Sequence, residues 1–161
     1  MKSECKYSFL EAKTKLEAFC AYQERCQFEI DQKLKIWAFD YEDRQRLISD
    51  LISNQFVDEE RFASAFVSGK YRIKKWGRIK IKSQLFQKHI STYSIQKALL
   101  EIDADEYWNN LIHLTERKYF ELRKINDKWE KKLKITRFLQ SKGYESDLIQ
   151  DALELVIATE Q

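Results

Sequence analysis

Apolar residues recur every three or four positions along most of the chain, which is the spacing of one face of an α-helix. In the segment that starts near Asp58, for example, Phe62, Ala65, Phe66 and Gly69 fall on one face. This periodicity predicts an all-α fold with helices at residues 12–25, 27–37, 41–53, 58–73, 78–88, 92–103, 105–124, 128–141 and 145–158.

Helix starts and stops are marked by polar caps rather than by long loops. Asp58 is expected to be an N-cap, because its carboxylate can accept from the free N–H groups of the first helical turn. Val57 and Phe62 then occupy the two positions of a hydrophobic staple. Asn54 is expected to be the left-handed residue that ends the preceding helix. Such short junctions are typical of helix bundles.

One of these junctions is repeated along the chain. Residues 85–99 align with residues 139–153 at a shift of 54 positions, and a shift back by 51 reaches residues 34–48. Each copy combines a helix end, a tight turn, a cap and a second amphipathic helix. Gly143 is expected to supply positive φ at the turn, and His89 to adopt the same conformation at some cost.

The repeat predicts three tandem three-helix units that form an elongated, curved body. Their ranges are 1–54 (with an N-terminal extension), 55–104 and 105–161. The first unit departs from the pattern, because Arg44 stands where the other two have isoleucine. Four aromatic residues are expected to pack the third unit: Trp108, Tyr119, Phe120 and Trp129.

Composition agrees with a helical protein and excludes several other classes. The chain has no proline and only three glycines, which excludes collagen-like and proline-rich proteins. Its three cysteines, Cys5, Cys20 and Cys26, form no CxxC pair and lie far from both histidines, which argues against a zinc site. No signal peptide or membrane span is recognisable, so we expect a cytoplasmic protein with reduced thiols.

Charge is distributed unevenly. Residues 55–104 hold 10 Lys and Arg against 5 Asp and Glu, whereas each flanking third is close to neutral. A segment without any acidic residue carries most of the excess and predicts contact with a polyanion, either nucleic acid or an acidic protein surface. The alternative is a solvated helix face. The candidate binding residues are Lys70, Arg72, Lys74, Lys75, Arg78, Lys80 and Lys82, with Lys88 at the end of the segment.

The same region resembles the RecX family of bacterial recombinase regulators. Residues 57–63 (Val-Asp-Glu-Glu-Arg-Phe-Ala) and Phe66 match an acidic turn followed by Arg-Phe-Ala. Residues 75–85 match a Gly-containing basic stretch, although Arg78 stands where family members often carry proline. Residues 137–144 match again in the third unit, and the resemblance covers almost the whole chain.

The resemblance implies a non-enzymatic regulator that binds the RecA recombinase, docks in the groove of its filament on DNA, and inhibits its recombination and ATPase activities. It also implies roles in DNA repair and the SOS response. The alternative is a helical nucleic-acid-binding protein that acts without RecA, on single- or double-stranded DNA. No cofactor is implied, and we expect a monomer.

Most residues that carry the resemblance are expected to be structural: Asp58, Arg61, Phe62, Ala63, Phe66, Trp76, Gly77 and Gly143. For two of them a role in partner binding is an alternative prediction. Arg61 pairs with nearby acidic residues, supports the turn or contacts a partner, and Trp76 seals a seam between helices or stacks on a partner beside the cations. Gly77 is expected to open the basic helix. No triad, nucleotide-binding glycine motif or metal-ligand spacing is present, so no catalytic residue is predicted.

Overall fold

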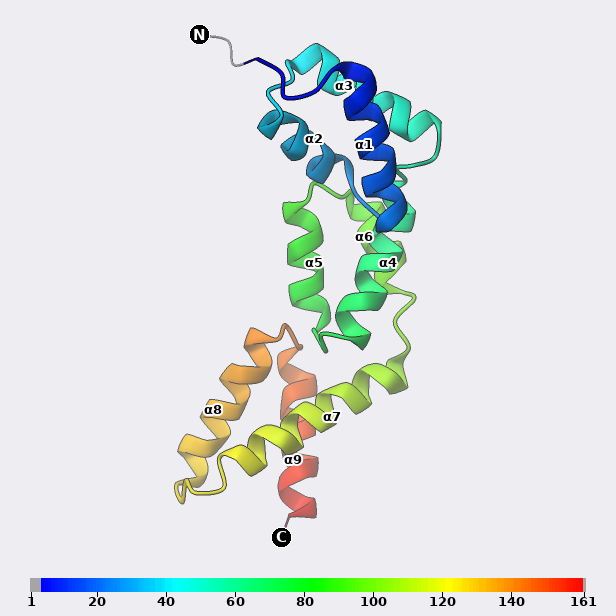
Figure 1. Cartoon of the computed structure of the whole chain (residues 1–161). Coiled ribbons are helices and arrows are strands. Elements are labelled where there is room, and N and C mark those ends of the chain that lie inside the picture. The colour runs from blue at the N-terminus through cyan, green and yellow to red at the C-terminus, as the bar shows by residue number, and fades with distance from the viewer. Residues whose placement is uncertain (1–3, 161) are drawn as a thin grey trace.

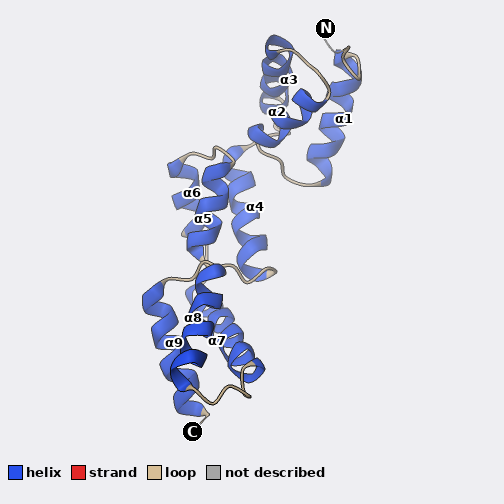
Figure 2. Ribbon diagram, turned by 90° about the vertical axis from the view of Figure 1, so that its left-hand side faces the viewer, coloured by secondary structure: helices blue, strands red, loops and turns tan. Residues whose placement is uncertain are grey.

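The computed structural model describes residues 4–160, and within this range it contains nine helices and no strand. The helices follow one another along an elongated, curved body whose two chain ends lie at opposite tips (Figures 1 and 2). The predicted all-α fold is confirmed. The helices are α1 (Phe9–Tyr22), α2 (Gln27–Ile36), α3 (Tyr41–Ser53), α4 (Glu59–Arg72), α5 (Arg78–Gln87), α6 (Thr92–Leu99), α7 (Ala104–Glu121), α8 (Lys128–Ser141) and α9 (Ser146–Thr159).

Most helix bounds agree with the sequence pattern to within three residues, and the exception is α6, which ends at Leu99 rather than at residue 103. Helix α1 begins earlier than predicted because Ser8 and Glu11 form a capping box. The predicted left-handed residue after α3 is wrong by one position: Asn54 has φ −92°, whereas Gln55 has φ 61°. Asn54 instead closes the last turn of the helix, donating from Nδ2 to the carbonyl oxygen of Asp50 at 2.9 Å.

The predicted repeat is present as a backbone motif that ends α2, α5 and α8. Ala38, His89 and Gly143 all have positive φ, at 66°, 59° and 92°. The N–H of the following residue donates back to a leucine carbonyl in each copy: Phe39 to Leu34, Ile90 to Leu85 and Tyr144 to Leu139, at 3.1–3.3 Å. This is the Schellman arrangement, which satisfies carbonyls that a helix end leaves free.

The first copy replaces the apolar staple by an ion pair. Arg44 donates from Nε to Asp31 at 2.8 Å and from a terminal nitrogen to the carbonyl oxygen of Phe39 at 3.1 Å. The guanidinium therefore links α2, α3 and the turn between them. Burial acts to raise the pKa of Asp31, but hydrogen bonds from Lys35 and Arg44 outweigh it and leave the pKa lowered.

Buried side chains form two separate cores. The first lies among α1, α2 and α3 and includes Leu16, Leu34 and Leu51. The second runs continuously through the other six helices and includes Leu85 and Leu139. The second and third units therefore bury their apolar faces in common. Of the aromatics expected in the third unit, Trp108 and Tyr119 pack against this core, but Phe120 and Trp129 are 64% and 75% exposed.

The junction between the second and third units is made by two glycines in close contact. The Gly77 N–H donates to the carbonyl oxygen of Lys142 at 2.7 Å, and the Ile79 N–H donates to that of Gly143 at 3.0 Å. A Cβ on Gly77 would overlap the Gly143 carbonyl, and a Cβ on Gly143 would overlap Lys80. Gly77 is the N-cap of α5, as predicted, and it is also the point where two helix ends touch.

The three cysteines differ in accessibility: Cys5 is exposed, whereas Cys20 and Cys26 are buried. Burial raises the pKa of the Cys20 thiol to about 11 and also raises that of Cys26. At pH 8 a thiol-specific reagent such as Ellman's reagent is expected to label Cys5 rapidly and the other two only after unfolding in denaturant, since the thiolate is the reactive form. Rapid reaction of two or three thiols in the native protein would contradict this.

Within residues 4–160, no helix combines the length and the apolar character that crossing a bilayer requires.

Candidate partner-binding surface

The basic stretch predicted from the sequence divides into paired and unpaired side chains. Arg72 lies 3.3 Å from Glu106, Arg78 lies 3.3 Å from Glu145, and Lys88 lies 2.8 Å from Glu29. These three cations join the second unit to its neighbours. Within the part of the chain that the structure describes, no ion pair involves the remaining five: Lys70, Lys74, Lys75, Lys80 and Lys82.

The unpaired lysines do not form one face. Ile81 is buried in the core, so the neighbouring Lys80 and Lys82 leave α5 on opposite flanks. Lys70, Lys74 and Lys80 lie on the side where α4 faces α5, whereas Lys82 points away from it. Lys75 is a turn residue with φ 56°, and its carbonyl oxygen accepts from the Tyr144 hydroxyl at 2.8 Å. The Lys75 backbone therefore takes part in the junction between the second and third units, whereas its side chain is one of the five unpaired lysines.

Arg78 is held by a cluster at the junction. Its guanidinium carbon lies 3.9 Å from the centre of the Tyr107 ring, and its backbone N–H donates to the Tyr107 hydroxyl at 3.0 Å. That hydroxyl donates to Glu145 at 2.7 Å. Burial, followed by the bond to Glu145, raises the pKa of Tyr107 well above its usual range. These contacts give Arg78 a structural role and make its guanidinium less available to a partner than the free lysines.

All three residues of the Arg-Phe-Ala motif make contacts within the chain. Asp58 caps α4 by accepting from the Arg61 N–H at 2.8 Å, as predicted. The Arg61 side chain donates to Glu24 at 2.7 Å and to the carbonyl oxygen of Gln55 at 2.9 Å, so it links the first unit to the second. Phe62 and Ala63 are buried in the core.

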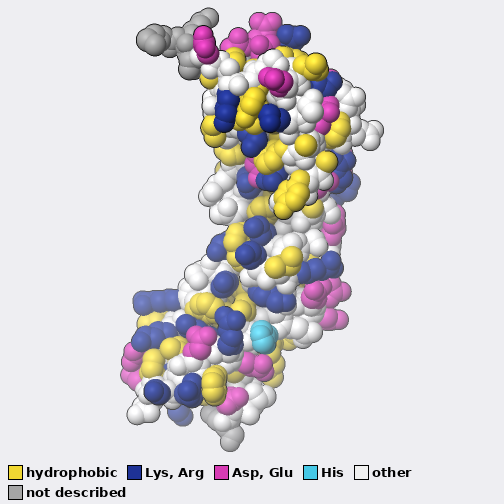
Figure 3. Space-filling model, viewed as in Figure 1, with side chains coloured by type: hydrophobic (Ala, Val, Ile, Leu, Met, Phe, Trp, Pro, Cys, Tyr) yellow, Lys and Arg dark blue, Asp and Glu magenta, His cyan; other side chains and the backbone are white. Residues whose placement is uncertain are grey.

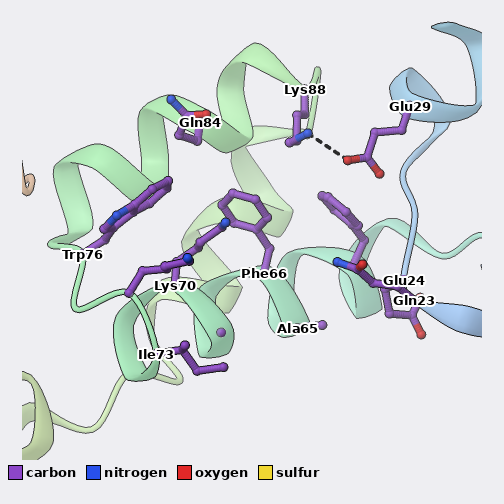
Figure 4. A pocket seen from close by; sticks show the side chains of 13 residues that line it. Gln23, Glu24, Glu29, Ala65, Phe66, Lys70, Ile73, Trp76, Gln84 and Lys88 are labelled. Atoms are coloured by element: carbon purple, nitrogen blue, oxygen red, sulfur yellow. Dashed lines mark hydrogen bonds and ion pairs between the residues drawn. The ribbon is translucent and has the colours of Figure 1, made fainter.

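Phe66 and Trp76 lie beside an open groove of about 500 Å³ between α4 and α5, with the loop after α1 at one end. Figure 4 shows both rings reaching toward the same space, with Lys70 beside them and Gln84 across from it. The Lys70 ammonium lies 4.7 Å from the Trp76 ring centre and 5.2 Å from that of Phe66. The Lys80 ammonium lies 4.4 Å from Trp76. Trp76 therefore both packs on the core and faces the groove.

A second basic surface was missed by counting charge over whole units. Residues 122–142 hold 8 Lys and Arg against 2 Asp and Glu, whereas α9 has three acidic residues and no cation. These opposite charges cancel in the total for the third unit. Lys and Arg side chains are visible over the end of the body where α8 lies (Figure 3). A count by predicted helix, rather than by unit, would have revealed this segment.

Among residues 4–160, no group of three or more His, Cys, Asp or Glu side chains is placed to hold a metal ion.

Comparison with known families gives two matches, both to parts of one family. Residues 58–99 match a family model described as "RecX, second three-helix domain", and residues 105–153 match "RecX, third three-helix domain". The matched ranges begin with the Asp58 cap and with α7, and together they cover more than half of the chain.

Curated relatives carry the same family name. The chain is 27% identical to "Regulatory protein RecX" of Clostridioides difficile over 92% of this chain and 69% of that protein. It is 33% identical to the protein of that name from Clostridium botulinum (strain Alaska E43 / Type E3) over 78% of this chain. It spans 59% of the length of that second relative.

Solved structures support the fold. A crystal structure of RecX from Lactobacillus salivarius superposes with a TM-score of 0.79 and 19% identity, covering 93% of this chain and 97% of that one. A second RecX crystal structure gives a TM-score of 0.78 at 22% identity, covering 89% of this chain and 71% of that one.

Proposed function

Because the chain belongs to the RecX family of regulatory proteins, we propose that it binds the filament of the RecA recombinase on DNA and lowers its ATP hydrolysis and strand exchange. The observation that carries this proposal is the set of five unpaired lysines in the second unit of an elongated body. A long body with a cationic middle suits a long groove that carries negative charge. The protein acts as a binding module, without catalysis of its own.

The test is a titration into RecA, single-stranded DNA and ATP. We expect ATP hydrolysis and strand exchange to fall as the protein approaches the concentration of filament sites. Unchanged rates at a stoichiometric excess would contradict the proposal. Increasing salt is expected to weaken the inhibition, because contacts to phosphates release counterions.

A matched pair of charge variants locates the contact. Changing the five unpaired lysines of the second unit to glutamine is expected to raise the concentration for half-inhibition by at least about tenfold, while Arg72 and Arg78 keep the junction intact. The comparison variant removes five cations from residues 122–142 instead: Lys124, Lys128, Lys131, Lys132 and Arg137. If this second variant loses more inhibition than the first, the third unit makes the main contact and the assignment to the second unit is wrong.

The alternative function is DNA binding without RecA, for which the same five lysines are the supporting observation. It predicts salt-sensitive binding to bare DNA with little base specificity, since contacts to phosphates carry no sequence information. Fluorescence anisotropy with labelled oligonucleotides separates the two. Tight binding to bare DNA together with unchanged RecA rates would favour the alternative.

A further inference from the structure

The groove between α4 and α5 is apolar at its centre, and no element within residues 4–160 covers it. Its floor is the side of α4 that carries Ala65, Phe66 and Gly69, and Trp76 closes one end. Helix α4 turns Ala63, Val67 and Tyr71 to the core, and Phe62 contacts both the core and the groove. At the groove mouth Ile73 is 79% exposed. The apolar stripe seen in the sequence therefore continues beyond the core and onto an open surface.

Gly69 keeps this floor flat, although the fold does not require a glycine there. A Cβ at Gly69 would meet no atom within 4 Å, and no positive φ is involved. Glycine inside a helix costs about 0.5–1 kcal/mol relative to alanine. Departures of this kind from local preference are found at functional sites. Gly69 differs in this respect from Gly77 and Gly143, whose close contacts require glycine.

Charge complementarity indicates what the groove binds. The two carboxylates that line it are already neutralised, Glu24 by Arg61 at 2.7 Å and Glu29 by Lys88 at 2.8 Å. Lys70 and Lys74, which also line it, take part in no ion pair among the described residues. An apolar floor beside free ammonium groups suits a segment that combines an apolar side chain with carboxylates.

A peptide fits this surface better than a nucleic acid. A phosphate backbone laid along the groove would meet unpaired cations at only one end, because the other end is formed by Glu24 and Glu29, each already paired with a cation of its own. Lys70 lies over the Phe66 and Trp76 rings, and pairing with a carboxylate of the peptide would draw its ammonium away and leave the two rings to the apolar side chain. A peptide needs only one anchoring side chain on the floor and acidic neighbours at the mouth.

We propose that the α4–α5 groove binds a short acidic segment of the recombinase, with one aromatic or branched aliphatic side chain seated over Gly69 between Phe66 and Trp76 and carboxylates paired with Lys70 and Lys74. This inference rests on the proposed function and specifies where the partner is held. The flat floor at Gly69 provides the space for the anchor, and the two lysines set the charge of the segment.

The test fills the groove without touching the core. Gly69→Leu places a side chain over the floor, and Ser83→Leu adds the same side chain at an exposed site of α5 that does not line the groove. Short overlapping peptides covering the RecA sequence serve as the probe. We expect the wild type to bind at least one acidic peptide containing an aromatic or branched aliphatic residue, Gly69→Leu to bind it at least about tenfold more weakly, and Ser83→Leu to bind it like the wild type.

The outcomes separate this inference from the proposed function. If the wild type inhibits RecA but Gly69→Leu inhibits equally well, the groove assignment is overturned while the proposed function stands. Binding of no acidic peptide also overturns it, as does a loss of oligo-dT binding in Gly69→Leu without a loss of peptide binding. Should Gly69→Leu unfold, the double variant Lys70→Glu with Lys74→Glu tests the same contact by charge and is expected to show the same loss.

Discussion

Replacing Gly77 by alanine is expected to lower the free energy of unfolding by about 3 kcal/mol, which corresponds to a fall of roughly 6–12 °C in Tm. The new Cβ would overlap the carbonyl oxygen of Gly143, which is backbone and cannot rotate away. Moving the two chains apart would lengthen the hydrogen bonds from Gly77 to Lys142 and from Ile79 to Gly143. Thermal unfolding followed by circular dichroism measures the effect.

The other two glycines make the comparison specific. Gly143→Ala is expected to destabilise by a similar amount, because its Cβ would overlap Lys80 and its φ of 92° disfavours any side chain. Gly69→Ala is expected to stabilise by about 0.5–1 kcal/mol, because its helix has open space there. Equal Tm values for the three alanine variants would show that the glycine contact does not hold the junction.

Leu139→Ala is expected to destabilise the second and third units together, by about 3 kcal/mol. Leu139 is fully buried in the core that runs through α4 to α9, and removing a buried leucine side chain loses burial and leaves a cavity. Because that core is continuous, the loss should appear in amides of both units. Hydrogen exchange under native conditions reads this residue by residue.

Leu34→Ala is the matched variant, because Leu34 is the equivalent residue of the repeat and is also fully buried. It belongs to the separate core of α1–α3, so its effect should be largest in those helices. If Leu34→Ala and Leu139→Ala lower protection uniformly across all nine described helices, the two cores unfold as one and this interpretation is wrong.

Local signals in the sequence were sufficient to predict most of the fold. Polar caps such as Asp58 and the repeated turn at His89 and Gly143 act through backbone geometry within a few residues, which a sequence shows directly. Asparagine favours the left-handed region, but the N–H groups of Phe56 and Val57 both donate to the Leu51 carbonyl oxygen, which places Gln55 rather than Asn54 in that region. The hydrogen-bond register of the whole turn outweighs the conformational propensity of one residue.

The candidate site was less predictable, because it depends on contacts between units. Nothing in the basic stretch itself indicates that Arg72 and Arg78 pair with Glu106 and Glu145 from the third unit while Lys70 and Lys74 stay unpaired. The sequence likewise places Ala65, Phe66 and Gly69 on one face but does not show that this face is open. Both features depend on residues that lie far apart in the sequence, so neither can be recognised from one segment of it.

The two junctions of the body differ in what resists bending. The second and third units share a core and backbone hydrogen bonds, so they form a stiff rod. Across the joint to the first unit, Cys26 packs in the second core, and the Arg61–Glu24 and Lys88–Glu29 ion pairs are partly exposed and weaken with ionic strength. The loop after α1 that carries Glu24 also forms one end of the groove. The length of the groove therefore depends on the angle between the first and second units.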